Sequence, residues 1–237
     1  MPFRVPRPAP LHAVLTAAAL AVTGCSGGGG TPATAPASAR PSAPPLTTTQ
    51  LRDTTFRKGE VPQMWEVDGM GVSERKSETG GRTFPPATVQ ACQTMNEISA
   101  GRRATAVVYQ ILNWKEQIFP GGTTLAAYED GAAERAFREL KESLGSCRTY
   151  DDWGYVGRIH CEVVPEPAPQ AGDEAISYRQ LSPAAGELSK ERNEQFIVVR
   201  TGNVLVTFTV LDVGQAPSFP PELVTKQVER LRDAQRR

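Results

Sequence analysis

Apolar residues recur at helical spacing in four stretches of the chain. The clearest stretch starts after Asp130, a candidate N-cap, and stops at Gly145. Its apolar residues share one face, and oppositely charged residues pair four positions apart on the other, which indicates a solvated helix face. Further helices are expected from Thr88 and from Pro220–Pro221 onward, and a short one within 47–56.

β-branched and aromatic residues concentrate in the segments between these helices and predict strands. The expected strands are 64–67, 104–112, 123–128, 153–164, 175–181, 195–200 and 203–211. Thr201-Gly202-Asn203 predicts a tight hairpin between the last two. This order of elements favours an α+β fold: a single domain whose mainly antiparallel sheet has helices packed on one side.

Composition limits the possible partners and chemistry. The formal net charge is zero, which argues against nucleic acid as a partner because such surfaces carry an excess of Lys and Arg. The chain has two His and four Cys, too few for most zinc sites or His-based triads. It contains no nucleophile elbow, Ser-x-x-Lys, His-Glu-x-x-His or P-loop motif, so we expect a non-catalytic protein without a cofactor or metal.

Residues 1–24 have the layout of a secretory signal peptide. Arg4 and Arg7 precede an apolar run at 11–22, which is too short for a stable transmembrane helix. The run ends in Val-Thr-Gly-Cys, which resembles a bacterial lipobox and implies cleavage before Cys25 and lipidation of its thiol. The membrane is then a partner through this lipid anchor, and the protein is expected on the extracytoplasmic face of the cell membrane.

A spacer separates this anchor from the folded part. Residues 25–45 follow the cleavage site, and after Cys25 they contain no acidic, aromatic or large aliphatic residue, so they cannot form a core. The Gly run and the spaced Pro residues are typical of a disordered linker. Residues 46–237 are therefore the predicted extracellular domain.

Three cysteines remain in that domain if Cys25 is acylated. An oxidising compartment predicts one disulfide and one remaining cysteine. Cys147 can pair with Cys161 across a turn expected around 151–154, or with Cys92 across a longer loop between two helices. The chain-entropy model gives about 3 kcal/mol for the shorter loop and about 4 kcal/mol for the longer one, which does not decide between them.

The domain resembles the PknH-type extracellular sensor domain of an actinobacterial serine/threonine kinase and of stand-alone lipoproteins. The similar features are a short leading helix, a helix containing Cys92, a strand–helix unit ending in Cys147, the nearby Cys161, and the hairpin VVRTGNVLVTF. The resemblance implies an antiparallel sheet with packed helices, a ligand cleft and a Cys92–Cys147 disulfide. Members commonly have four domain cysteines in two disulfides. This domain has three, which leaves Cys161 as a possible free thiol.

The leading functional hypothesis is a sensor-like domain that binds a small molecule or envelope component. Aromatic rings combine apolar area with a polar group and are the candidate cleft residues. They are Trp65, Trp114, Tyr128, Trp153 and Tyr155. The alternatives are an envelope protein-interaction module and a cell-envelope hydrolase. The adjacent carboxylates Glu129–Asp130 and Asp151–Asp152 are the only feature that suggests a hydrolase, and local hydrogen bonding explains them more simply.

Overall fold

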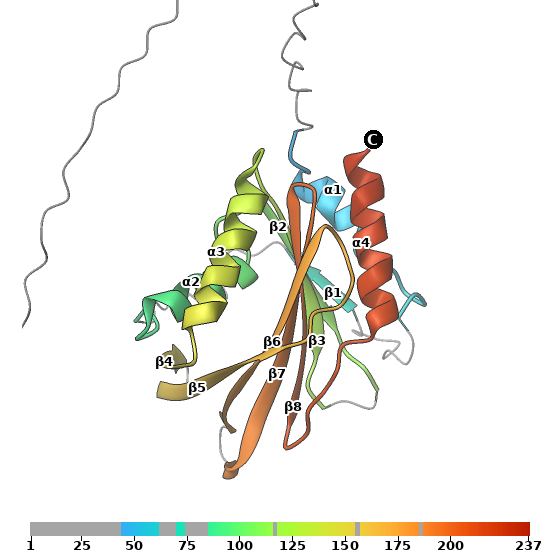
Figure 1. Cartoon of the computed structure of the whole chain (residues 1–237). Helices are drawn as coiled ribbons and strands as arrows, with labels where there is room; N and C mark the ends of the chain where they lie inside the picture. Colours follow the sequence, from blue (N-terminus) through green and yellow to red (C-terminus); the bar gives the residue numbers. More distant parts are fainter. Residues whose placement is uncertain (1–43, 62–69, 74–84, 116–117, 155–156, 185–186) are drawn as a thin grey trace, which may run out of the picture. The chain divides into compact units, whose positions relative to one another are not determined.

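A computed structural model describes residues 44–61, 70–73, 85–115, 118–154, 157–184 and 187–237 (Figure 1). The expected signal peptide, Cys25 and the linker up to residue 43 lie outside these residues, as does the strand expected at 64–67. The described residues from 44 onward belong to one compact unit. Within the described part of the chain, no helix is long and apolar enough to cross a membrane.

The described residues contain eight strands, which form one sheet in the order β1-β2-β3-β8-β7-β6-β5-β4. Every neighbouring pair is antiparallel, which confirms the α+β class and the antiparallel sheet. The strands are β1 (Met70–Ser73), β2 (Ala106–Leu112), β3 (Gly121–Ala127), β4 (Thr149–Gly154), β5 (Gly157–Glu166), β6 (Glu174–Ala184), β7 (Glu187–Thr201) and β8 (Val204–Val213).

Four helices in the described part of the chain cover both faces of this sheet, so the expectation of helices on one side is wrong. They are α1 (Thr48–Asp53), α2 (Gln90–Ser99), α3 (Ala132–Ser146) and α4 (Pro221–Gln235). α1 and α4 share a core with Val199 and Val206, whereas α2 and α3 share one with Val198 and Leu205 (Figure 1). Successive strand residues point to opposite faces of the sheet. The nearly continuous apolar runs of β7 and β8 therefore require helices packed on both faces.

Two local expectations need correction. α3 begins after Gly131 in the left-handed conformation rather than at an Asp130 cap, and it continues through Gly145 to Ser146. It ends there because Cys147 is extended. The turn expected around 151–154 is also misplaced, because Asp151 and its neighbours lie in β4 and pair with β5. The β7–β8 hairpin is confirmed, with Gly202 at φ 55°.

A disulfide between Cys92 and Cys147 joins α2 to the end of α3 and confirms the pairing that the resemblance implied. The two Cα atoms are 5.1 Å apart and 55 positions apart in the sequence. Both sulfurs lie in the core beneath α2 and α3. Cys161 is buried and forms no disulfide among the described residues.

Hydrogen bonds and an ion pair join the segment after α1 to α4. The Arg230 guanidinium donates to the carbonyls of Thr54 and Thr55 and to the Glu60 carboxylate, at 2.7 Å for the shortest Glu60 contact. Gln227 also donates to the Thr54 carbonyl, at 3.0 Å. The hydrogen bond from Arg230 lowers the pKa of Glu60 from 4.5 to about 2.

A second ion pair lies on the same face as α4. Arg179 pairs with Glu166 and also donates to Asn193 at 2.9 Å and to the Pro217 carbonyl at 2.8 Å. The Arg179 side chain is only 13% exposed, and each of its three guanidinium nitrogens donates to one of these acceptors. This network holds the segment before α4 against β6.

Candidate functional site

An open groove lies on the sheet face that carries α2 and α3. Two adjoining pockets of about 440 and about 370 Å³ share Asp152, Gln180 and Glu194 among their lining residues. The larger pocket lies mainly over β2, β3 and β8 and reaches β6 and β7, whereas the smaller one lies over β4 to β7. We call the two pockets together the groove. Their volumes fall within the range of small-molecule sites.

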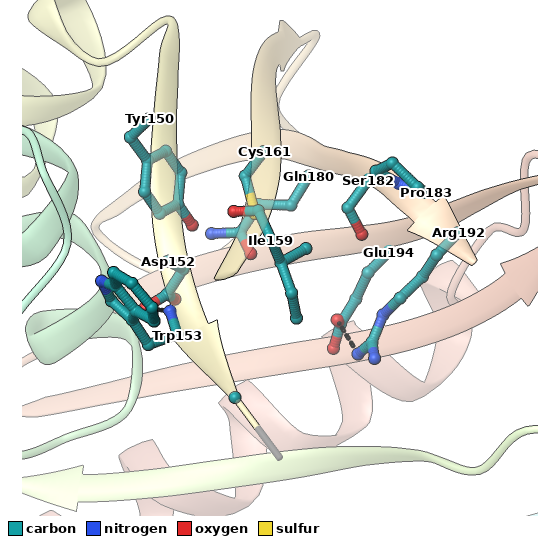
Figure 2. Close-up of a pocket in the computed structure, with 11 residues that line it drawn as sticks. Tyr150, Asp152, Trp153, Ile159, Cys161, Gln180, Ser182, Pro183, Arg192 and Glu194 are labelled. Atoms are coloured by element: carbon teal, nitrogen blue, oxygen red, sulfur yellow. Dashed lines mark hydrogen bonds and ion pairs between the residues drawn. The ribbon is translucent and has the colours of Figure 1, made fainter. Parts of the chain in front are cut away.

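The alternation of side chains along the strands builds the smaller pocket. Most of its lining consists of cross-strand neighbours that point to one face, because residues two apart share a face (Figure 2). These neighbours are Tyr150 with Cys161, Asp152 with Ile159, Gln180 with Glu194, and Ser182 with Arg192. The register of β4 to β7 therefore determines which groups meet in this pocket.

Small residues form the floor of the larger pocket. Thr124 pairs with Thr207, and Gly122 pairs with Thr209, across the β3–β8 ladder. A Cβ atom on Gly122 would lie 2.6 Å from the Gln110 carbonyl oxygen, so the close approach of β2 requires glycine here. The missing side chain also leaves the floor open between Ile111 and Thr209.

The C-terminal end of α2 forms one wall of the groove. Hydrogen bonds hold it to the sheet: the Tyr109 hydroxyl donates to the Ala100 carbonyl at 2.6 Å, and the Ser99 and Tyr178 hydroxyls lie 2.8 Å apart. Asn96 receives a hydrogen bond from Gln180 at 2.8 Å and donates to the Tyr150 hydroxyl at 3.1 Å. The wall is therefore fixed before any ligand arrives.

Two groups of the smaller pocket, the Tyr150 hydroxyl and the Cys161 thiol, remain protonated near neutral pH. Burial raises the pKa of the Tyr150 hydroxyl and that of the Cys161 thiol. A protonated, buried thiol is a poor nucleophile. The charged groups of the smaller pocket are Asp152, Glu194 and Arg192, of which Glu194 and Arg192 form an ion pair at 2.7 Å (Figure 2).

Of the three candidate aromatics that the structure describes, only Trp153 lies in the groove. Trp153 lines the smaller pocket and is 36% exposed. Trp114 is buried on the opposite face, where its ring packs edge-on against Phe219 at 5.8 Å, so it belongs to the core there. Trp65 and Tyr155 lie outside the described residues.

Tyr128 is a core residue rather than a cleft residue. It is 3% exposed and packs in the cluster beneath α2 and α3. Burial raises its pKa to about 12, and its hydroxyl has no hydrogen-bond partner within the described part of the chain. The sequence composition of its strand does not reveal that the ring points into this core.

The adjacent carboxylates do not converge on one site. Asp152 faces the groove, whereas Asp151 contacts Arg158 and His160, the latter at 2.9 Å. The hydrogen bond from Arg158 lowers the pKa of Asp151. Glu129 and Asp130 are exposed just before α3. In the ranges that the structure describes, no three His, Cys, Asp or Glu side chains gather closely enough to hold a metal.

Sequence reasoning missed most of the polar lining of the groove. Gln180, Glu194, Thr207 and Thr209 come from three strands and meet only through their register. One sequence pattern does indicate part of this lining. Thr207 and Thr209 stand at alternate positions in the apolar run of β8, which places their two hydroxyls on one face of the sheet.

Comparisons with known proteins identify the fold. No family model matches the chain, and no curated protein matches it. A solved structure, the extracellular domain of PknH from Mycobacterium tuberculosis, is similar with a TM-score of 0.58 and 14% sequence identity. The similarity covers 80% of this chain and 98% of that domain. It confirms the expected PknH-like fold.

Proposed function

We propose that this chain is an extracytoplasmic lipoprotein whose sensor-like domain binds a small molecule or envelope component in the groove. One observation carries the proposal. Three large apolar residues are exposed in the described part of the chain: Ile111 at 48%, Ile118 at 93% and Trp153 at 36%. Ile111 lines one pocket of the groove and Trp153 the other. Exposed apolar side chains within a concave polar site are typical of binding surfaces.

Two observations support the location outside the cytoplasm. The sequence before the domain has a signal-like segment that ends in a lipobox-like Cys25. The similar solved domain is described as extracellular, and it shares this fold over most of the chain. A lipid on Cys25 would hold the domain at the membrane surface through the linker.

The chemistry of the groove supports binding without catalysis. Tyr150 and Cys161 keep their protons near neutral pH because burial raises their pKa values. The Glu194 carboxylate is held by Arg192. These groups position hydrogen bonds and do not supply an activated nucleophile.

Mass spectrometry of the full chain from its own membrane tests both parts of the proposal. Under denaturing conditions we expect the mass of a chain that starts at Cys25 and carries acyl chains, and a Cys25→Ala variant should lack this product. Under native conditions we expect an additional mass from a bound component. A Thr124→Trp variant fills the larger pocket and should lose that component.

The matched control is Thr225→Trp, which adds the same ring on the exposed surface of α4. It should keep the bound component, and thermal unfolding should show that both variants fold. An unlipidated chain would refute the anchor. The same excess of native over denatured mass in the wild type and in Thr124→Trp would refute binding in the groove.

A further inference from the structure

The floor of the groove presents hydroxyl and amide groups. Thr124, Thr207 and Thr209 lie on adjacent strands β3 and β8, and Gln180 lies at the junction of the two pockets. Hydroxyls and amides both donate and accept hydrogen bonds. A lipid acyl chain would desolvate these groups without replacing their hydrogen bonds, which costs free energy. The floor therefore favours a ligand that is itself rich in hydroxyl groups.

The charges of the groove balance one another. Asp152 and Glu194 are carboxylates at the junction, and Arg192 and Arg102 are the guanidinium groups of the lining. Arg192 already pairs with Glu194 at 2.7 Å. A phosphate or another anion at the junction would lie next to two carboxylates, which repel it. Charge complementarity therefore favours an uncharged ligand.

Apolar surface lies in each pocket alongside the polar floor. Ile111 lines the larger pocket and Trp153 the smaller one, and both are exposed. The Tyr109 ring also lines the larger pocket, where its hydroxyl bond to α2 fixes its position. A sugar ring offers apolar C–H faces to such side chains and hydroxyl groups at its rim to a polar floor.

We propose that the groove binds a short, uncharged oligosaccharide. Sugar hydroxyls bond to the partly exposed side chains of Gln180, Thr124 and Thr209, and a ring face packs on Trp153. This inference rests on the proposed function, since it names the class of ligand for the same groove. The extent of the groove over two adjoining pockets suits several linked rings better than one.

A peptide added as a further strand is a poorer fit at this site. The outer edge of β4 is the sheet edge next to the groove, and its Asp151 backbone is already occupied. Thr88 N–H donates to the Asp151 carbonyl at 3.0 Å, and Asp151 N–H donates to the Thr88 hydroxyl at 2.9 Å. Strand addition needs these backbone groups free. Recognition in the groove therefore uses side chains on the sheet face.

The test is binding of the full lipidated chain to an array of uncharged and anionic oligosaccharides, in a detergent that contains no sugar. The array carries gluco-, manno-, galacto-, arabino- and N-acetylglucosamine oligomers beside uronic acid and sulfated oligomers. The strongest uncharged oligosaccharide is then titrated by calorimetry. We expect its affinity to stay constant between about 0.05 and about 0.5 M NaCl, because screening does not affect an uncharged ligand.

Variants connect the binding to the groove. Trp153→Ala should weaken binding about tenfold by removing the ring face. Thr209→Val keeps the shape of the side chain and should weaken binding about fivefold by removing a hydroxyl. Ile118→Ala is the matched control, because Ile118 is 93% exposed and lines neither pocket, and it should leave the affinity unchanged.

The outcomes separate this inference from the function on which it rests. Binding of anionic oligosaccharides alone, or uncharged binding that Trp153→Ala and Thr209→Val leave intact, would overturn it. If no oligosaccharide binds but a native mass still shows a component that Thr124→Trp removes, the ligand is of another class and the proposed function stands. If neither binding nor a component is found, both proposals fail.

Discussion

Removing the Cys92–Cys147 disulfide should lower the free energy of unfolding substantially. The bond closes a loop over a sequence separation of 55, for which the chain-entropy model gives about 4 kcal/mol. It also fixes α2, whose residue Asn96 lies in the wall of the groove and bonds to Gln180. Loss of the disulfide should therefore lower the stability strongly and leave the α2 wall of the groove less firmly positioned.

Urea unfolding, followed by far-UV circular dichroism, measures this loss. A Cys92→Ala/Cys147→Ala variant and the reduced wild type should both unfold at a midpoint about 2 M lower than the oxidised wild type, taking a slope of about 2 kcal/mol per molar urea. The slope should rise slightly because the unfolded chain without the crosslink is more extended.

A Cys161→Ala variant is the control, since it removes a buried thiol without breaking a crosslink and should cost about 1 kcal/mol. Comparison of the reduced wild type with the double variant separates the crosslink from the loss of sulfur packing. Midpoints that differ by less than about 0.3 M between the oxidised and reduced wild type would refute the reasoning.

Three further predictions concern the ion pairs and one glycine. Glu60→Gln should cost about 1–2 kcal/mol near neutral pH by weakening the bond to Arg230. Because folding lowers the pKa of Glu60 from 4.5 to about 2, the difference from wild type is complete above pH 4.5 and should vanish as the pH falls toward 2; a difference independent of pH would contradict this. Arg179→Ala should cost about 3 kcal/mol in urea unfolding, whereas Arg158→Ala, 62% exposed, should cost less than about 0.5 kcal/mol; equal costs would contradict the burial argument. Gly172→Ala should cost about 2 kcal/mol or more, seen as a lower melting temperature, because φ is +68° and a Cβ would lie 2.3 Å from a Val199 methyl group; an unchanged melting temperature would contradict that clash.

Elements set by local sequence were predicted well. The Thr201–Asn203 turn and the apolar stripes of α3 and α4 depend on residues a few positions apart, and the structure has all three. The placement of helices on both faces was not predictable in the same way. The apolar run of β8 is compatible with burial on one face or on two, and only the tertiary packing decides between them.

The groove was harder to predict than the fold for a related reason. Composition marks Trp114 and Trp153 as equivalent candidates, yet one ring lies in the core and the other in the groove. The pairing of Gln180 with Glu194 depends on the register of β6 and β7, which an amino-acid pattern does not specify to within one residue. The disulfide pairing came from the family resemblance, since loop entropy alone left two choices.

The native mass of the full chain purified from its own membrane tests the central claim most directly. The account predicts that the wild type and Thr225→Trp carry a bound component in addition to the lipid on Cys25, and that Thr124→Trp carries the lipid alone. A wild-type mass explained by the lipidated chain with nothing bound would contradict it.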